Sequence, residues 1–308
     1  MYGKILAITS ALLLSACANS VANEASNEAV ETSSIPADQQ AFLNACEPWD
    51  EWDKPAPPFK VHANTYYVGT CGIASILISD EAGHIIIDSG TEGGADVVIA
   101  NVKALGFEIA DVRILLSSHE HFDHVGGMAK LQAATGAAIV TSQPAAAVLA
   151  TGQIAANDPQ FGSHEPFDIV PVGRIISTGQ TVTLAGNSVR AIETPGHSPG
   201  ALSWAWQECA ERCENIVYAD SLSPISRDDY KFSDNPTYLA AYRAGLELLR
   251  LEDCQILLTP HPSHSRLLAR MEAGHLIQNA PDDDPCRAYA DGKLEDIESR
   301  LREEANTE

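Results

Sequence analysis

Short apolar runs alternate with turns and amphipathic segments over the first half of the chain beyond residue 60. The apolar stretches 75–78 and 85–87 flank the turn Asp80-Glu81-Ala82-Gly83, which predicts a β-hairpin over 75–88. Apolar residues at helical spacing predict a helix over 95–105 that ends at Gly106. The other segments expected here are strands at 112–116 and 138–140 and helices at 128–135 and 144–150. Strands that alternate with helices favour helices packed on the faces of a sheet.

The second half again places a hairpin before helices. Two alternating runs around Gly186-Asn187 predict a hairpin over 181–193. Strands are then expected at 202–206, 216–218 and 255–258, and helices at 238–251 and 266–276. Two halves of this kind predict an α/β sandwich with two central sheets and the helices outside. Because no Pro/Gly linker follows residue 60, we expect one domain over residues 41–305.

The N-terminus has the pattern of an export signal. Its apolar run over 5–14 is shorter than the roughly 20 residues that a membrane-spanning helix needs. The run ends in Leu14-Ser15-Ala16-Cys17, which resembles the bacterial lipobox and predicts a signal peptide over 1–17 with Cys17 as the lipidated residue. Because Ala18 is not Asp, this resemblance implies a periplasmic protein tethered to the outer membrane. With an incidental Cys17, an ordinary signal peptide would give a soluble periplasmic protein. Residues 18–40 lack large apolar side chains almost entirely, so we expect a flexible tether.

Composition narrows the classes of partner. The chain has 308 residues, 45% of them hydrophobic, which is enough for a sizeable core. With 42 acidic against 19 basic residues its net charge is −23, and such a surface repels nucleic-acid phosphates and anionic lipid headgroups. We therefore expect no nucleic-acid partner, and contact with a membrane only through the N-terminal lipid. We also expect a monomer.

Cysteine usage agrees with export. Of the seven cysteines, six remain once Cys17 is set aside, and an oxidising compartment favours their pairing over free buried thiols. Six cysteines allow fifteen connectivities. Cys209 and Cys213 bracket a short charged turn, so we expect these two to pair with each other.

The densest group of metal-binding side chains follows the predicted strand at 112–116. Three imidazoles and one carboxylate lie within six residues, at His119, His121, Asp123 and His124. In an extended stretch His119 and His121 project to one side, whereas Asp123 and His124 fall where the chain turns into a helix. This spacing predicts the ligands of a two-metal hydrolase rather than a solvated His-rich loop.

Two more histidines follow predicted strands in Gly/Pro turns, His197 in Pro195-Gly196-His197 and His261 in Pro260-His261-Pro262. Loops that follow a rigid strand commonly carry binding residues, so these two histidines are candidate metal ligands. For the other histidines we expect surface or ordinary hydrogen-bonded roles, with His264 as a rival to His261; they are His62, His84, His164, His264 and His275. Asp88, at the end of an apolar strand, is expected to orient a ligand.

These motifs together resemble the metallo-β-lactamase superfamily, through His119-x-His121-x-Asp123-His124. More narrowly they resemble the third subclass of class B β-lactamases, through residues 67–70, 194–200, 218–223 and 257–262. The resemblance runs from residue 50 to 290 and implies the αβ/βα sandwich of that superfamily with two Zn²⁺ ions. It implies His119, His121 and His197 as ligands of the first zinc. It implies Asp123, His124 and His261 as ligands of the second.

The resemblance also implies the function and three disulfides. The expected activity is hydrolysis of the β-lactam amide of penicillins, cephalosporins and carbapenems by a hydroxide that bridges the metals, hence antibiotic resistance. Asp123 would orient the hydroxide or pass a proton, while Ser221 and Ser223 would bind water and the substrate carboxylate. Other subclasses have a cysteine ligand at the position of Ser221. The implied disulfides are Cys254–Cys286 and, as in some members, Cys209–Cys213 and Cys46–Cys71.

Two alternatives remain. A thioesterase or lactonase of the same superfamily would bridge its two metals with an aspartate after a strand, and Asp220 is such an aspartate. A non-catalytic periplasmic zinc-binding protein is disfavoured because all six ligands are present. Glu120 lies between two ligands and is expected to point away from the metals. Members of the family commonly carry a small residue at this position.

Overall fold

A computed structural model describes residues 1–3, 35–278 and 284–306. The chain divides into one unit over 1–33 and a second over 34–308 that carries all the elements below. Most of the expected signal peptide, its Cys17 and the larger part of the expected tether lie outside the described residues. Among the helices that are described, none is both long and apolar enough to cross a bilayer.

The expected end of the tether at residue 40 is wrong. Helix α1 (Ala37–Ala45) already begins within it. The helix forms there because Phe42 is fully buried, with its ring 4.9 Å from that of Phe59 and 5.0 Å from that of Tyr67. One large apolar side chain thus anchors a segment whose composition is otherwise polar.

The first sheet has seven strands in the order β1-β2-β3-β4-β5-β6-β7. Their bounds are β1 Phe59–His62, β2 Thr65–Tyr67, β3 Ile76–Ile78, β4 His84–Ile87, β5 Val112–Leu116, β6 Ala138–Thr141 and β7 Arg174–Ile175. β1 to β4 are antiparallel neighbours, and β4 to β7 run parallel. The helices that accompany this half are α2 (Glu92–Ala104), α3 (Phe122–Val125), α4 (Met128–Thr135) and α5 (Gln143–Leu149).

The second sheet has five strands in the order β12-β11-β10-β9-β8. Their bounds are β8 Thr181–Leu184, β9 Asn187–Glu193, β10 Leu202–Cys209, β11 Cys213–Tyr218 and β12 Ile256–Leu258. The pairing is antiparallel except between β11 and β12. The helices of this half are α6 (Pro236–Arg250), α7 (Leu267–Glu272) and α8 (Pro285–Ala305).

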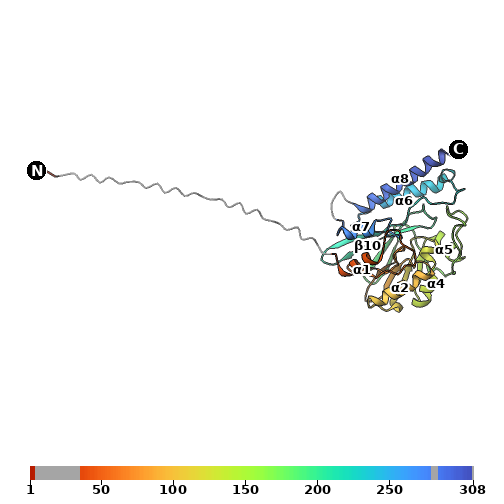
Figure 1. The fold of residues 1–308 in the computed structure, drawn as a ribbon, viewed down its shortest axis with the longest axis horizontal. Coiled ribbons are helices and arrows are strands. Elements are labelled where there is room, and N and C mark those ends of the chain that lie inside the picture. The colour runs from red at the N-terminus through yellow and green to blue at the C-terminus, as the bar shows by residue number, and fades with distance from the viewer. Residues whose placement is uncertain (4–34, 279–283, 307–308) are drawn as a thin grey trace. The chain divides into compact units, whose positions relative to one another are not determined.

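The core lies in three apolar layers. One cluster packs between the inner faces of the two sheets, with Trp204, Tyr67 and Tyr218 among its largest members. A second covers the other face of the first sheet under α2 and α4, and a third lies under α6 and α8. Figure 1 shows α6 and α8 on one outer side and α2 and α4 on the other. The fold is therefore the expected α/β sandwich, with the sheets inside.

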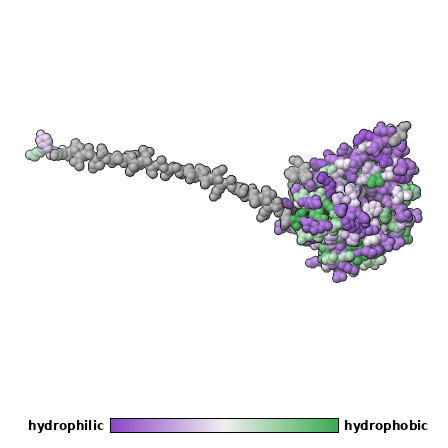
Figure 2. All heavy atoms as spheres, in the orientation of Figure 1, coloured by the Kyte–Doolittle hydropathy of each residue, from purple (hydrophilic) through white to green (hydrophobic). Residues whose placement is uncertain are grey.

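The face of this unit seen in Figure 2 is mostly polar, as the acidic composition requires, with apolar residues scattered over it. Exposed large apolar side chains include Trp49, Trp52 and Phe161.

Local capping explains where the helices begin and end. The Thr91 hydroxyl accepts a hydrogen bond from the Gly94 amide at the start of α2, and Ser142 does the same for Ala145 at α5. Asp284 caps α8. Gly136, in the left-handed conformation at φ 70°, ends α4 where sequence predicted.

Most predicted elements are present, with ends shifted by a few residues. Both hairpins, the strand at 112–116 and the helix at 128–135 are confirmed. The sequence missed α1, β1, β2, β7 and the long C-terminal helix α8, which lack a strong local period. The structure pairs the six described cysteines as Cys46–Cys71, Cys209–Cys213 and Cys254–Cys286.

Candidate metal centre

Strand ends from both sheets supply the site. β5 ends just before His119, β9 before His197, β11 before Asp220 and β12 before His261. β11 runs parallel to β12, and the antiparallel pairs of β10 with β9 and with β11 make β9 run the same way. Carboxyl ends of strands that run alike meet at one edge, so segments distant in sequence converge there.

Five of the six predicted ligands form two overlapping groups that share His119. The ligand atoms of His119, His121 and His197 lie within 4.8 Å of one another, and so do those of His119, Asp123 and His124. All five side chains are buried.

His261 completes the second group. Its Nε2 lies 3.3 Å from Oδ2 of Asp123, and its ring centre is 5.0 Å from that of His124. The rival, His264, packs on His261 and Trp49, with ring centres 5.2 Å and 5.1 Å away. The structure thus brings all six predicted ligands together.

Buried partners orient three of the imidazoles. Nδ1 of His119 lies 2.8 Å from Oδ1 of Asp220, and Nδ1 of His197 lies 2.9 Å from the carbonyl oxygen of Ser223. Nε2 of His121 lies 3.1 Å from Oδ2 of Asp158. These contacts favour a proton on the nitrogen that faces the partner and leave the other nitrogen as the donor to a metal.

Asp88 has the orienting place expected for it. Its carboxylate accepts hydrogen bonds from the amide and hydroxyl of Ser118 and from the hydroxyl of Tyr218, and lies 3.5 Å from Nδ1 of His124. The backbone of Asp88 has φ 61°, a left-handed conformation that is uncommon outside glycine. Such strain concentrates where a site demands a particular side-chain direction.

The electrostatics favour a cation among these groups. Burial lowers the pKa of His119 and His197 well below the ordinary value, so both are neutral and able to donate a lone pair. Burial opposes the charged form of His124, but Asp123 and Asp88 outweigh it and raise the pKa of His124 to about 10. The carboxylates thus attract positive charge strongly enough to retain a proton there.

The donor set fits a metal. Nε2 of His119 is buried without a hydrogen bond, and Nε2 of His124 lies only 3.0 Å from Oδ2 of Asp123, so the two nitrogens and the carboxylate converge. Unpaired buried nitrogens are costly unless a ligand satisfies them. Imidazole with one carboxylate is the donor set that suits zinc.

Glu120 points away from the ligands, as expected, and joins two ligand-bearing loops. Its carboxylate accepts hydrogen bonds from the hydroxyl of Ser198 at 2.7 Å and from the amide of Gly200 at 2.8 Å. Burial raises the pKa of Glu120 to about 7. A Cβ at Gly200 would lie 2.7 Å from the Glu120 carboxylate, so this close approach requires glycine.

Ser221 and Ser223 lie beside the centre on the loop after β11. Oγ of Ser221 is buried without a hydrogen bond. Oγ of Ser223 donates to the carbonyl oxygen of Ser221 at 3.2 Å and accepts from Nζ of Lys293. The hydroxyl of Tyr289 donates to the carbonyl oxygens of Asp220 and Ser221.

Sequence reasoning missed several residues at the centre. Asp158 contacts His121, and Nε2 of Gln160 lies 3.3 Å from Nε2 of His197. His164 makes an ordinary hydrogen bond, as expected, with Nε2 lying 3.3 Å from Oε1 of Gln160, but its ring also lies 4.7 Å from that of His121, a contact that the sequence did not indicate. All three lie in a loop without periodicity, so only the tertiary contact could reveal them.

Comparisons with known proteins agree with this geometry. The profile of the metallo-β-lactamase superfamily matches residues 68–209. The solved structure of the MIM-2 metallo-β-lactamase is 48% identical, with a TM-score of 0.83 over 87% of this chain and 98% of that one. The chain belongs to the metallo-β-lactamase superfamily.

Solved metallo-β-lactamases of subclass B3 are among its structural neighbours. MEM-A1, a subclass B3 enzyme isolated from a soil metagenome library, is 34% identical, with a TM-score of 0.78 over 84% of this chain and 100% of that one. The resemblance to the third subclass of class B, which is subclass B3, is thereby confirmed, and so is the expected sandwich fold. This fold supports a metal-dependent hydrolase.

Curated relatives include thioester hydrolases. The hydroxyacylglutathione hydrolase GloC of Haemophilus influenzae is 25% identical over 63% of this chain and 86% of that protein. A probable metallo-hydrolase of Burkholderia pseudomallei is 31% identical over 45% of this chain, and the chain spans 49% of its length.

Proposed function

We propose that this protein is a zinc-dependent β-lactamase that hydrolyses the β-lactam amide of penicillins, cephalosporins and carbapenems. His119, His121 and His197 would hold one Zn²⁺, and Asp123, His124 and His261 a second. Zinc bound there supplies Lewis acidity, which acidifies a water and polarises the substrate carbonyl.

One observation carries the choice of β-lactamase over thioesterase. In the thioesterase and lactonase relatives an aspartate after a strand is expected to bridge the metals, and Asp220 holds the comparable place. Here Oδ1 of Asp220 lies 2.8 Å from Nδ1 of His119, and Oδ2 accepts the amide of Leu222 at 3.3 Å. Both oxygens are thus engaged with partners other than a metal, and Asp220 acts by orienting His119.

The chain's own residues have defined tasks in this proposal. Neighbouring imidazoles outweigh burial and hold the pKa of Asp123 well below its usual range, so its carboxylate is ionised, as a metal ligand must be, and would orient the attacking water. The hydroxyls of Ser221 and Ser223 would donate to the substrate carboxylate. Asp220 and Asp158 keep the imidazoles in place, so the donor atoms need no reorganisation during the reaction.

An aromatic wall suits the apolar side chain of a β-lactam. The ring of Phe122 lies 5.5 Å from those of Trp52 and His164. Trp52 is 41% exposed and lines a cavity of about 600 Å³ together with Phe122.

The deciding assay compares substrates on the zinc-loaded protein. A chromogenic cephalosporin and a carbapenem should be hydrolysed faster than a hydroxyacyl thioester of glutathione. Asp220→Ala should weaken metal binding by about 10- to 100-fold, as loss of an orienting partner does, yet leave two zinc sites per chain at saturation. Faster thioester turnover, together with loss of one zinc site in Asp220→Ala, would support the thioesterase instead.

We also propose that the enzyme works in the periplasm as a monomer, tethered to the outer membrane through lipid on Cys17. The lipobox-like segment Leu14-Ser15-Ala16-Cys17 supports this, as do six cysteines that are paired in the folded unit. Membrane fractionation of cells that express the protein or its Cys17→Ala variant tests the tether, because only the unchanged protein should sediment with outer membranes.

A further inference from the structure

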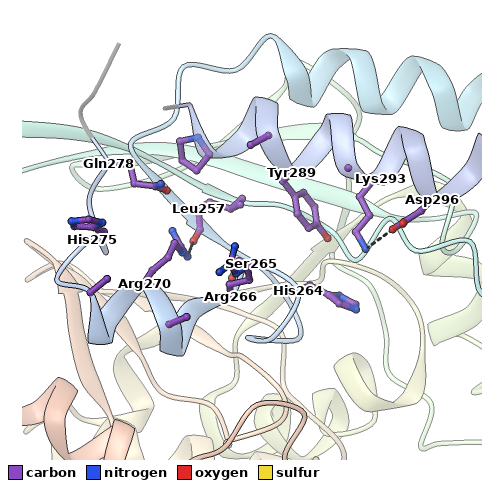
Figure 3. A pocket seen from close by; sticks show the side chains of 15 residues that line it. Leu257, His264, Ser265, Arg266, Arg270, His275, Gln278, Tyr289, Lys293 and Asp296 are labelled. Carbon is purple, nitrogen blue, oxygen red and sulfur yellow. Dashed lines mark hydrogen bonds and ion pairs between the residues drawn. The ribbon is translucent and has the colours of Figure 1, made fainter. Parts of the chain in front are cut away.

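Lys293 of α8 reaches the loop that carries the two serines. Its Nζ donates a hydrogen bond to Oγ of Ser223 at 2.8 Å and lies 3.3 Å from Oδ2 of Asp296. The ammonium also lies 5.4 Å from the ring centre of Tyr289, one helical turn earlier. Figure 3 shows Lys293 and Tyr289 projecting from the same helix, with the ion pair to Asp296 dashed. Both residues line a cavity of about 560 Å³.

The side chain of Lys293 is largely shielded from water, although the chain is strongly acidic. Its side chain is only 12% exposed, whereas that of Asp296 is 53% exposed and therefore well screened by water. Burial lowers the pKa of Lys293 below its ordinary value. Asp220 adds a favourable charge from beyond ion-pair distance. An ammonium whose paired counter-charge is well exposed can still attract another anion.

The hydrogen bond fixes the direction in which the Ser223 hydroxyl donates. Because Nζ donates into Oγ, the proton of Ser223 is left for another acceptor, at present the carbonyl oxygen of Ser221 at 3.2 Å. A carboxylate is a better acceptor than a carbonyl at that length. Lysine, serine and carboxylate would form a chain of donors that polarise one another.

The loop is held so that it cannot drift away from the lysine. Tyr289 binds the carbonyl oxygens of Asp220 and Ser221, and the hydroxyl of Tyr242 binds that of Leu222. Leu222 has φ 47°, a left-handed conformation that these contacts maintain. The place of the Ser223 hydroxyl is therefore set by two helices, α6 and α8.

We propose that Lys293 is a positioning residue that acts through Ser223 to give the site its preference for substrates with a carboxylate. The inference rests on the proposed β-lactamase function, because penicillins, cephalosporins and carbapenems all carry a carboxylate beside the ring nitrogen. Lys293 adds a positive charge to the recognition of that carboxylate. The serine hydroxyls alone would offer it only neutral hydrogen-bond donors.

The test compares a chromogenic cephalosporin with its methyl ester, at one zinc concentration. Lys293→Met removes the charge and keeps an unbranched apolar stem, so the packing around Tyr289 is retained. KM for the acid should rise about tenfold with little change in kcat, since a hydrogen bond to a charged group is lost. KM for the ester should stay the same, and Lys293→Arg should recover most of the affinity for the acid.

The matched control is Arg243→Gln, which also removes a cation that contacts α8. Arg243 pairs with Glu298 at 2.6 Å on the surface, and its loss should leave KM for both substrates unchanged. Equal losses on acid and ester in Lys293→Met, or an unchanged KM for the acid, would overturn the role of Lys293. Failure of the unchanged protein to hydrolyse either compound, with turnover of a thioester, would instead overturn the proposed function. If Lys293→Met does not fold, the same comparison is made with Lys293→Gln, judged by thermal unfolding beforehand.

Discussion

Removal of the disulfide between Cys254 and Cys286 measures how firmly α8 is tied to the second sheet. The bond joins Cys254, two residues before β12, to Cys286 in the first turn of α8, over a sequence separation of 32. Both side chains are buried, so alanine at both positions leaves no unpaired polar atom. On the loop-entropy relation, opening a loop of this length lowers the free energy of unfolding by about 3.7 kcal/mol.

The same chain contains a matched control. Cys209 and Cys213 are separated by only 4 residues and join the ends of β10 and β11. The same relation gives about 1.9 kcal/mol for their removal. Because that hairpin end contributes no side chain to the metal centre, its double alanine variant should keep the activity of the unchanged protein.

Urea unfolding of the three proteins at pH 7 and a fixed zinc concentration supplies the comparison. The variant without Cys254–Cys286 should also lose affinity for carboxylate substrates, since α8 carries Tyr289 and Lys293. The reasoning is refuted if both double variants lose the same free energy, or if the loss at Cys254–Cys286 is below about 1 kcal/mol.

Three further predictions concern the centre itself. Chelation by EDTA should abolish β-lactam hydrolysis and zinc should restore it, measured with a chromogenic cephalosporin; full activity without metal would contradict the proposed ligands. Ser221→Ala should weaken substrate binding by about 1 kcal/mol, because one hydrogen-bond donor to the substrate carboxylate is lost. Asp123→Ala should lower turnover far more, and metal analysis should show that the second zinc is lost. Burial raises the pKa of Glu120 from 4.5 to about 7, so the folded metal-free protein holds a proton that the unfolded chain releases in that window. Its stability should therefore fall as pH rises from 4.5 to 7, and Glu120→Gln should flatten this slope in urea unfolding; an unchanged slope would count against the buried carboxylate.

Local patterns were enough to predict the layers of the fold. Apolar runs of period two between turn residues predicted both hairpins, and Gly106 and Gly136 marked the ends of two helices. These elements are predictable because their burial pattern repeats along the segment. α1 and β1 were missed because single residues, Phe42 and Phe59, anchor them through ring contacts with each other and with Tyr67 of β2 rather than through a repeating pattern.

For the site, the sequence by itself determined the residue types of the six proposed ligands. Their spacing and the Gly/Pro turns after predicted strands were visible without any structure. Apart from Asp88, which the sequence already indicated, only the tertiary structure decided which groups orient those ligands. Asp158, Asp220 and Lys293 reach the centre from segments 37, 101 and 70 residues away from their partners. A ligand at a strand end is specified by local chemistry, whereas an orienting partner is specified by which segments the packed sheets and helices bring within hydrogen-bond distance.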